Sequence, residues 1–348
     1  MFYNDDMSFT LNKKIVIPIS IIIVLVLAVL IAFRVSPAPG AAIIRIVFDK
    51  DAHQKREAME KLPGTPTNVE LVSDVSYAEG DKDAVLDVYV PKNSEYANKS
   101  LPVVVWTHGG AWISGDKTDT IPYFKRLADK GFVVVAVNYS LAPQKKYPYQ
   151  IEQLNKAHAF IKNNIQRYNG NPSKIVLAGD SAGSQLSSQL AAIATNPSYA
   201  SEMNIQPSLE PSDIAGMVLY CGIYKMETLA EHHKDLSKIV SWGNRITIWS
   251  YTGTRDSETP LIKQMSAYYH ANSDFPDSFI SGGNGDLLTD VQSKPFAVKL
   301  QEMGVDVETK FYEANHTPSL PHENQFVLDK DGLENFETMV NFLKQKTS

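Results

Sequence analysis

The sequence predicts an α/β fold, in which a mostly parallel sheet carries helices on both faces. From Val69 onward, short apolar runs bounded by turn residues alternate with longer amphipathic runs. The runs at 103–107 and 132–138 are almost continuously apolar, as strands buried on both faces are. The run at 121–130 has helical character and stops at Gly131 between those two strands. This strand–helix–strand order is typical of parallel sheets.

The same patterns place the remaining elements. We expect strands at 85–90, 103–107, 132–138, 174–178, 215–220, 278–281 and 307–312. We expect helices at 121–130, 150–168, 186–194, 291–303 and 333–344. The interval 225–277 breaks the alternation and is rich in Trp and Tyr. We interpret it as an insertion over the carboxyl edge of the sheet, where open α/β sheets bind ligands.

The N-terminus predicts a membrane span. Residues 15–33 carry no charge, and a helix of that length covers about 28 Å, close to the thickness of a bilayer core. We expect a single uncleaved anchor with the large domain outside the cytoplasm. Secretion after cleavage of a signal peptide stays open, because Ala38 and Gly40 suit a signal peptidase.

These features divide the chain into three parts. Residues 1–35 form the tail and the anchor (or signal sequence), and 36–65 form a linker with an amphipathic helix or cap. Residues 66–348 form one α/β domain that includes the insertion. The net charge of −6 argues against a nucleic-acid surface. Cys221 is the only cysteine, which excludes an internal disulfide and a cysteine-built zinc site. We expect neither a metal nor an organic cofactor.

One short segment carries the strongest chemical signal. Residues 177–186 read LAGDSAGSQL, so Ser181 lies between a strand and a helix with small residues around it. A Gly-x-Ser-x-Gly turn in this context exposes the serine hydroxyl in a strained backbone conformation. It also points the hydroxyl at the amino end of the helix, where free N–H groups favour negative charge. We predict Ser181 as a nucleophile.

A second segment predicts the matching anion site. The strand at 103–107 leads directly into the sequence HGGAW, which begins at His108. Glycines let backbone amides approach an oxyanion, so we predict a hole formed by the amides of Gly109, Gly110 and Ala182. His108 is expected to brace this loop through a hydrogen bond. Its neighbours Ala111 and Trp112 are predicted to line the substrate pocket.

A serine nucleophile needs a histidine base and a carboxylate that orients it. His316 follows the last strand by a short loop and is the predicted base, with His322 as the alternative. The glycine-rich segment after the strand at 278–281 leads to Asp286, the predicted acid. Asp290 is its rival, although a place at a helix start explains it as a cap. Asp180 is added to the predicted pocket.

Together the segments HGGAW, NYSLAP, GDSAG and GDLLTD and a late histidine resemble the α/β-hydrolase fold. More narrowly, they resemble the carboxylesterases and acylhydrolases similar to hormone-sensitive lipase. The resemblance covers about residues 66–348 and implies Ser181, Asp286 and His316 as a catalytic triad. Three departures from the family pattern stand out. Ala111 replaces a third glycine, Ser140 replaces an arginine, and Thr317 stands where glycine often follows the base.

The resemblance implies hydrolysis of carboxylic esters through an acyl-enzyme. We expect short- to medium-chain acyl esters, a small-molecule ester as the partner, and attachment to a membrane. An amidase or arylformamidase, and a sugar-ester deacetylase, would share every residue named so far. A binding-only member of the fold is the remaining alternative, because fold alone does not fix function.

Overall fold

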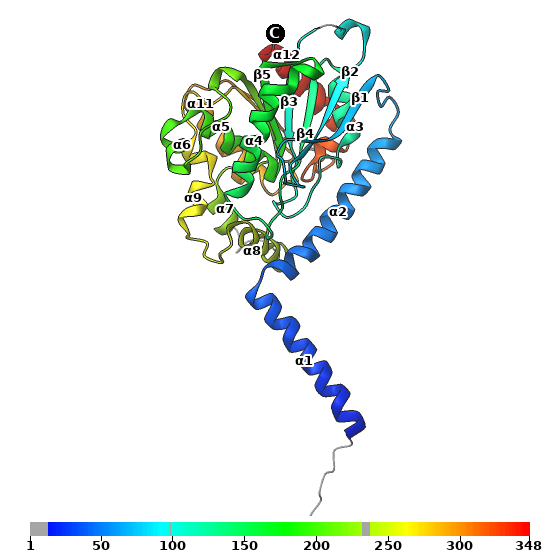
Figure 1. Ribbon diagram of the computed structural model, residues 1–348, viewed down its shortest axis with the longest axis vertical. Coiled ribbons are helices and arrows are strands. Elements are labelled where there is room, and N and C mark those ends of the chain that lie inside the picture. The colour runs from blue at the N-terminus through cyan, green and yellow to red at the C-terminus, as the bar shows by residue number, and fades with distance from the viewer. Residues whose placement is uncertain (1–12, 98, 232–236) are drawn as a thin grey trace, which may run out of the picture.

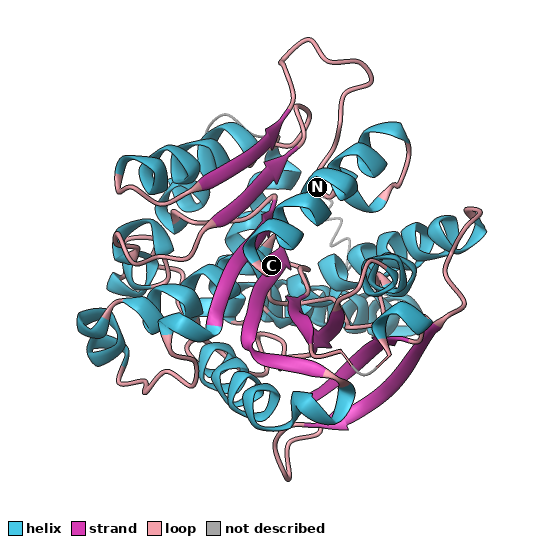
Figure 2. Cartoon of the chain, turned by 90° about the horizontal axis from the view of Figure 1, so that it is seen from above, coloured by secondary structure: helices cyan, strands magenta, loops and turns pink. Residues whose placement is uncertain are grey.

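An eight-stranded twisted sheet with helices on both faces forms the body of the molecule (Figures 1 and 2). The computed structural model describes residues 13–97, 99–231 and 237–348. The sheet order is β1-β2-β4-β3-β5-β6-β7-β8, in which β2 is antiparallel to both of its neighbours, β1 and β4, and the remaining pairs are parallel. The strands are β1 (Val69–Ser76), β2 (Val85–Pro91), β3 (Leu101–Thr107), β4 (Val133–Val137), β5 (Gly170–Asp180), β6 (Ile214–Tyr220), β7 (Ser278–Gly282) and β8 (Val307–Phe311).

The central strands are apolar on both sides because each face of the sheet carries its own core. In β3, Val105 pairs with Val135 on one side and Leu177 on the other. Alternate side chains of a strand point to opposite faces. Accordingly, Val105 belongs to one hydrophobic cluster and its neighbour Trp106 to the other. The continuous apolar runs seen in the sequence therefore have a direct structural cause.

Helices cover both faces. One face carries α4 (Tyr149–Asn164), α5 (Ala182–Thr195) and α11 (Lys294–Glu302), and the other carries α3 (Ile121–Asp129) and α12 (Lys330–Lys346). The remaining elements are α6 (Pro197–Met203), α7 (Met226–Glu231), α8 (Lys238–Thr252), α9 (Pro260–Gln264), α10 (Ala267–His270), η1 (Ser94–Tyr96), η2 (Ile165–Tyr168), η3 (Pro211–Asp213), the π-helical turn η5 (Thr289–Ser293) and η6 (Asn324–Phe326).

The interval 225–277 is helical and connects β6 to β7 through α7, α8, α9 and α10. Its residues 232–236 lie outside the described residues. Helix α8 lies at the end of the molecule from which the N-terminal helix leaves (Figure 1). On α8, the ring of Tyr251 stacks on that of Trp112, with ring centroids 4.6 Å apart. The insertion is therefore packed onto the loop that follows β3.

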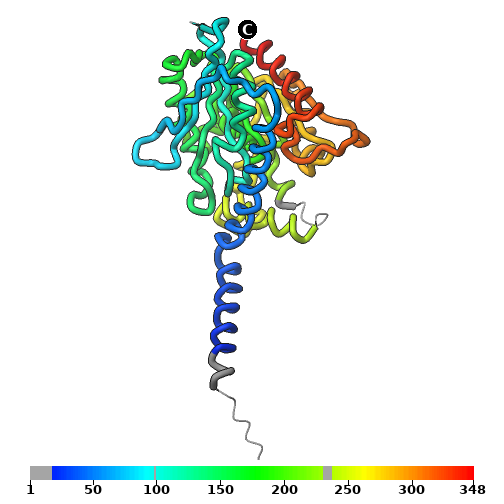
Figure 3. The backbone as a smooth tube through the Cα atoms, turned by 90° about the vertical axis from the view of Figure 1, so that its right-hand side faces the viewer, coloured from blue at the N-terminus to red at the C-terminus, as the bar shows by residue number. Residues whose placement is uncertain are grey.

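Two long helices precede the sheet. Helix α1 (Lys13–Val35) extends away from the body, and α2 (Ala38–Lys61) runs back along it (Figures 1 and 3). Within α1, the segment Pro18–Val35 has a mean hydropathy of 2.8, is not buried, and is long and apolar enough to cross a membrane. The chain from Ala38 to Lys61 thus forms one continuous helix.

Helix α2 is fastened to the loops at the carboxyl end of the sheet. The Arg45 side chain donates to the carbonyl oxygens of Ile113 and Ala142, at 2.5 and 3.0 Å. Ser114 donates its hydroxyl hydrogen to a carboxylate oxygen of Asp49 at 2.5 Å. These contacts make α2 part of the folded domain instead of a free linker.

The packing of α5 on β3 gives a stability prediction. A Cβ at Gly183 would overlap the carbonyl oxygens of Thr107 and His108, which are backbone atoms that cannot move aside. We therefore expect Gly183→Ala to lower the free energy of unfolding by about 1–3 kcal/mol or more. Gly243 of α8 has open space at its Cβ position, so Gly243→Ala is the matched control. Thermal unfolding of both variants measures the difference, and equal melting temperatures would contradict this packing.

Candidate active site

Ser181 lies at a sharp turn between β5 and α5. Its backbone has φ 51° and ψ −117°, a conformation that costs energy for any residue except glycine. The turn is held because the Ser181 amide donates to the carbonyl oxygen of Tyr220 at 2.9 Å. Glycines flank it because a Cβ at Gly179 would overlap the backbone of Gly183. The side chain is nearly enclosed, with the residue only 7 % exposed. The turn predicted from the sequence is thus present.

Asp180 joins this turn to the loop after β3. Its carboxylate accepts hydrogen bonds from the indole of Trp106 at 2.7 Å and from the amide of Gly109 at 2.8 Å. Burial, together with the charge of Glu323, raises the pKa of Asp180 to about 7. The predicted place of Asp180 in the substrate pocket is wrong, because the side chain is buried beneath the loop.

The oxyanion prediction needs a related correction. Since the amide of Gly109 is bonded to Asp180, it is not available to an oxyanion. The next two amides, of Gly110 and Ala111, donate to no acceptor among the described residues. Both residues have positive φ angles, 92° and 51°, which turn the loop sharply here. Ala182 begins α5, so its amide has no acceptor within the helix.

Two aromatic side chains brace the loop from below. The hydroxyl of Tyr139 donates to the carbonyl oxygens of His108 and Gly109, both at 3.1 Å. The ring of His108 stacks on that of Tyr139, with centroids 4.3 Å apart, and its Nδ1 lies 2.9 Å from the Gly109 oxygen. Burial lowers the pKa of His108, which keeps this imidazole neutral. The hydrogen bond predicted for His108 is present.

His322 is the imidazole that the structure places at the serine. Its Nε2 lies 3.0 Å from the hydroxyl oxygen of Ser181. Its Nδ1 lies 3.0 Å from a carboxylate oxygen of Asp286, whose side chain is 2 % exposed. The other carboxylate oxygen of Asp286 accepts from the amide of Leu288 at 2.9 Å. Hydroxyl, imidazole and carboxylate thus form one connected line.

The choice of His316 as the base is wrong in this geometry. Its Nε2 lies 3.1 Å from a carboxylate oxygen of Asp331 at the start of α12. Its ring packs against Tyr312, with centroids 5.0 Å apart. Asp290, the rival acid, is 79 % exposed and pairs with Lys294 one helical turn away. Asp286 is therefore the acid that faces the imidazole.

Hydrogen bonds between two loops explain why His322 reaches the serine. The side-chain amide of Asn284 donates to the carbonyl oxygen of His316 at 3.0 Å and accepts from the amide of Leu320 at 2.9 Å. The amide of Gly285 donates to the Leu320 oxygen at 2.8 Å. The segment after β8 is thereby drawn across the glycine-rich turn after β7. The sequence signals this change of base only at Thr317, which stands where glycine often follows the base in the family pattern.

Trp112 is part of the core and does not line a pocket as predicted. The residue is fully buried, and its indole donates to the side chain of Gln185 at 2.9 Å. The stack with Tyr251 covers its other side. Ala111 is half-buried beside the free amides, and its place in the substrate pocket stays a prediction.

Cys221, which the sequence left without a role, lies beside the imidazole. Ligand atoms of Cys221, Asp286 and His322 all lie within 4.8 Å of one another. Burial lowers the pKa of His322, whereas Cys221 and Asp286 raise it, and the net pKa lies well above 6.5. Burial raises the pKa of the Cys221 thiol, which therefore stays neutral. The Asp286 carboxylate is accordingly the charge that stabilises the imidazolium.

Comparison with known proteins agrees with this architecture. Residues 86–300 match the BD-FAE family, a segment that contains Ser181 and Asp286 and ends before His322. The chain belongs to the BD-FAE family. It is 27 % identical over 238 residues to esterase LipQ of Mycobacterium tuberculosis, covering 67 % of this chain and 53 % of that protein. It is 28 % identical over 248 residues to a probable isoprenylcysteine α-carbonyl methylesterase of Oryza sativa, covering 70 % and 56 %. The chain thus spans about half the length of these curated relatives.

Solved structures confirm the predicted α/β-hydrolase fold. Esterase B of Lactobacillus rhamnosis superposes with a TM-score of 0.77 at 20 % identity, covering 89 % of this chain and 96 % of that one. An esterase of Pyrobaculum calidifontis superposes with a TM-score of 0.66 at 21 % identity, covering 88 % and 93 %. The family match, the esterase relatives and these folds together confirm the resemblance drawn from the sequence.

The pKa of His322 is testable without any substrate. We expect the Asp286→Asn variant to have a lower His322 pKa than the unsubstituted protein, because the charge that stabilises the imidazolium is gone. Asp290→Asn removes a charge that does not touch the imidazole and is the control. Titration followed by NMR of labelled histidine measures the three values. A His322 pKa that is the same with and without the Asp286 charge would contradict the assignment.

Proposed function

We propose that this protein hydrolyses carboxylic esters through an acyl-enzyme formed on Ser181. The observation that carries the proposal is the line of two 3.0 Å contacts from the Ser181 hydroxyl through His322 to Asp286. An alcohol is a weak nucleophile unless a base takes its proton, and this arrangement supplies such a base. The esterase relatives point to the same reaction class.

In the first half of the proposed reaction, the Ser181 oxygen attacks the ester carbonyl carbon while Nε2 of His322 takes its proton. The Asp286 carboxylate faces Nδ1 and stabilises the imidazolium. The carbonyl oxygen becomes negative, and the amides of Gly110, Ala111 and Ala182 are the donors that receive it. The tetrahedral intermediate then collapses, and Nε2 returns the proton to the leaving alcohol.

In the second half of the reaction, a water molecule takes the place that the serine hydroxyl had in the first half. It attacks the acyl carbon of the Ser181 ester, Nε2 of His322 takes its proton, and the same amides hold the oxyanion. Collapse releases the carboxylic acid and returns the proton to the serine oxygen. The acyl group thus leaves as the acid together with the hydroxyl of the water molecule, the other proton of that water restores the serine hydroxyl, and the protein ends unchanged.

We propose short- to medium-chain acyl groups as the substrates. The Ser181 residue is 7 % exposed, and the half-buried methyl group of Ala111 lies next to the free amides, so the space near the acyl carbon is narrow. The aromatic residues Trp112 and Tyr251 are fully buried against each other and add no acyl-binding surface.

We propose further that α1 is an uncleaved membrane anchor with the body of the protein outside the cytoplasm. Cleavage near Ala38 or Gly40 would cut inside the first turn of α2. Gly40 is buried there, and its Cα approaches the side chain of Ile246 so closely that an added Cβ would lie 3.0 Å from it. Loss of the residues before the cut would remove the packing of the start of α2 against Ile246 of α8.

Turnover of aryl esters tests the proposed function. We expect Ser181→Ala and His322→Ala each to lower kcat by about 10⁴-fold or more, since the nucleophile or its base is lost. His316→Ala is the matched control, because its imidazole contacts Asp331 and not the serine, and it should retain most of the activity. A fluorophosphonate probe should label the unsubstituted protein and fail to label Ser181→Ala. Equal labelling of both, or loss of activity only in His316→Ala, would overturn the proposal.

A second prediction concerns Asp180 as a positioning residue. An asparagine accepts through one oxygen only, so Asp180→Asn forces an N–H group against either the Trp106 indole or the Gly109 amide. The loop that carries the Gly110 and Ala111 amides should then shift. We expect kcat to fall by about 10²–10³ with little change in KM, as when an oxyanion donor is lost.

The matched control for that variant is Asp213→Asn, another buried carboxylate that pairs with Lys162 away from the site. It should keep full kcat at a temperature where it is folded. If Asp180→Asn changes only KM, or if both variants lose kcat alike, Asp180 has no role in holding the amides.

A further inference from the structure

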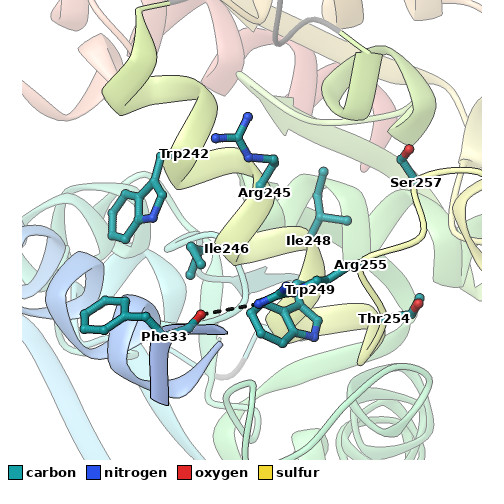
Figure 4. Close-up of a pocket in the computed structure, with 9 residues that line it drawn as sticks. All are labelled: Phe33, Trp242, Arg245, Ile246, Ile248, Trp249, Thr254, Arg255 and Ser257. Atoms are coloured by element: carbon teal, nitrogen blue, oxygen red, sulfur yellow. Dashed lines mark hydrogen bonds between the residues drawn. The ribbon is translucent and has the colours of Figure 1, made fainter. Parts of the chain in front are cut away.

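A pocket lies where α1 meets α8, away from the proposed active site. Its volume is about 290 Å³, and Figure 4 shows its lining side chains. Phe33 comes from α1, Trp242, Arg245 and Trp249 come from α8, and Arg255 comes from the loop that follows α8. The lining therefore combines aromatic rings with two guanidinium groups at the end of the proposed anchor.

Arg255 ties the two helices together. Its guanidinium lies over the ring of Trp249, 3.8 Å from the centroid. It donates to the carbonyl oxygen of Phe33 at 3.3 Å and to that of Arg34. These carbonyls close the last turn of α1, where cations are favoured. The exposed guanidinium keeps one face toward solvent, so it can also meet an anion.

Arg245 is exposed one helical turn before Trp249. Among the described residues, neither it nor Arg255 forms an ion pair with a carboxylate. Asp256 and Glu258 follow in the same loop, but Asp256 accepts from the Glu258 amide at 2.9 Å and thus faces its own turn. The pocket consequently carries positive charge without an acidic partner.

The surface around the pocket is apolar. On α8, Ile239 is 79 % exposed, and on the first half of α2, Ile46 and Val47 are 69 % and 59 % exposed. Helices α2 and α8 pack together, and both lie beside the end of α1 (Figures 1 and 3). Exposed apolar surface of this kind marks an interaction site, and here it lies on helices beside the end of the apolar span (Figure 1).

We propose that the pocket binds the phosphate headgroup of an anionic membrane phospholipid, and that α8 and the first half of α2 rest on the bilayer. The proposal depends on the proposed anchor, because α1 brings the pocket to the bilayer surface. Trp and Arg suit that depth, since their apolar parts sit among lipid chains and their polar ends reach the headgroups. A lipid matches the two guanidinium groups, which form no ion pair among the described residues, and also the apolar rim. A soluble anion would match the guanidinium groups alone.

This placement also concerns the ester site. Helix α8 runs from the pocket to Tyr251, which stacks on Trp112 beside the oxyanion loop. The carboxyl end of the parallel strands faces the same end of the molecule as α8 (Figure 1). A bound headgroup would therefore hold the proposed active site next to the membrane, where apolar esters collect.

Quenching of tryptophan fluorescence tests the headgroup site in the full chain. Trp106 and Trp112 are 1 % and 0 % exposed, so lipid can reach only Trp242 and Trp249. The protein is placed in nanodiscs of phosphatidylcholine with either brominated phosphatidylglycerol or brominated phosphatidylcholine at equal fraction. We expect the brominated anionic lipid to quench at least about two-fold more. Arg245→Gln with Arg255→Gln should abolish that preference, which comes from charge.

The matched control is Arg167→Gln. Arg167 is an exposed arginine of η2, which comes just before the start of β5 and so lies at the amino end of the parallel strands. It should keep the preference for the anionic lipid. Equal quenching by the two lipids in the unsubstituted protein would overturn the headgroup site. A second copy of the chain in the pocket would also overturn it. In that case the protein would be a dimer in detergent, and neither brominated lipid would quench Trp242 or Trp249.

Two further readouts separate this inference from the proposals on which it depends. Extraction of native membranes with alkaline carbonate tests the anchor: release of the full chain would overturn the anchor and the headgroup site together. Retention of the chain with no lipid preference would overturn the headgroup site alone. Turnover of a water-soluble aryl ester tests the proposed esterase, and the arginine variants should leave it within about two-fold of the unsubstituted protein.

Discussion

The close approach of the Ser181 turn to the loop after β3 is the constraint on which the candidate site depends. The Asp180 carboxylate bridges the two by accepting from Trp106 and from the Gly109 amide. Gly183 allows the contact, because any side chain there would overlap the backbone at Thr107. The proposed nucleophile and the free amides are thus positioned by one junction between neighbouring strands, and the buried Asp180 carboxylate holds this junction together.

A second junction delivers the imidazole. Asn284 bonds the segment between His316 and Leu320 onto the turn after β7, so that His322 lies over the serine and Asp286 lies behind it. Next in the chain, Glu323 pairs with Lys55 of α2 at 2.9 Å. Helix α2 therefore reaches the residue adjacent to the proposed base.

The sequence was informative where the structure is local. The strand–helix alternation predicted the sheet, and the small residues around Ser181 predicted the strained turn, because both depend on neighbours in the chain. The identity of the base was not predictable in this way, since it depends on side-chain bonds from Asn284 in a distant segment. The sequence does not distinguish Gly109 from Gly110 as an oxyanion donor. The structure does, because the amide of Gly109 donates to Asp180 and the amide of Gly110 does not.

The structure of a phosphonate adduct tests most directly whether the site works as proposed. In such an adduct phosphorus is bonded to the serine oxygen and a phosphoryl oxygen stands where the oxyanion would be. We predict that this oxygen lies within about 3 Å of the amides of Gly110, Ala111 and Ala182, with Nε2 of His322 beside the serine oxygen. A phosphoryl oxygen bonded instead to the amide of Gly109, or a serine oxygen approached by His316, would contradict the account.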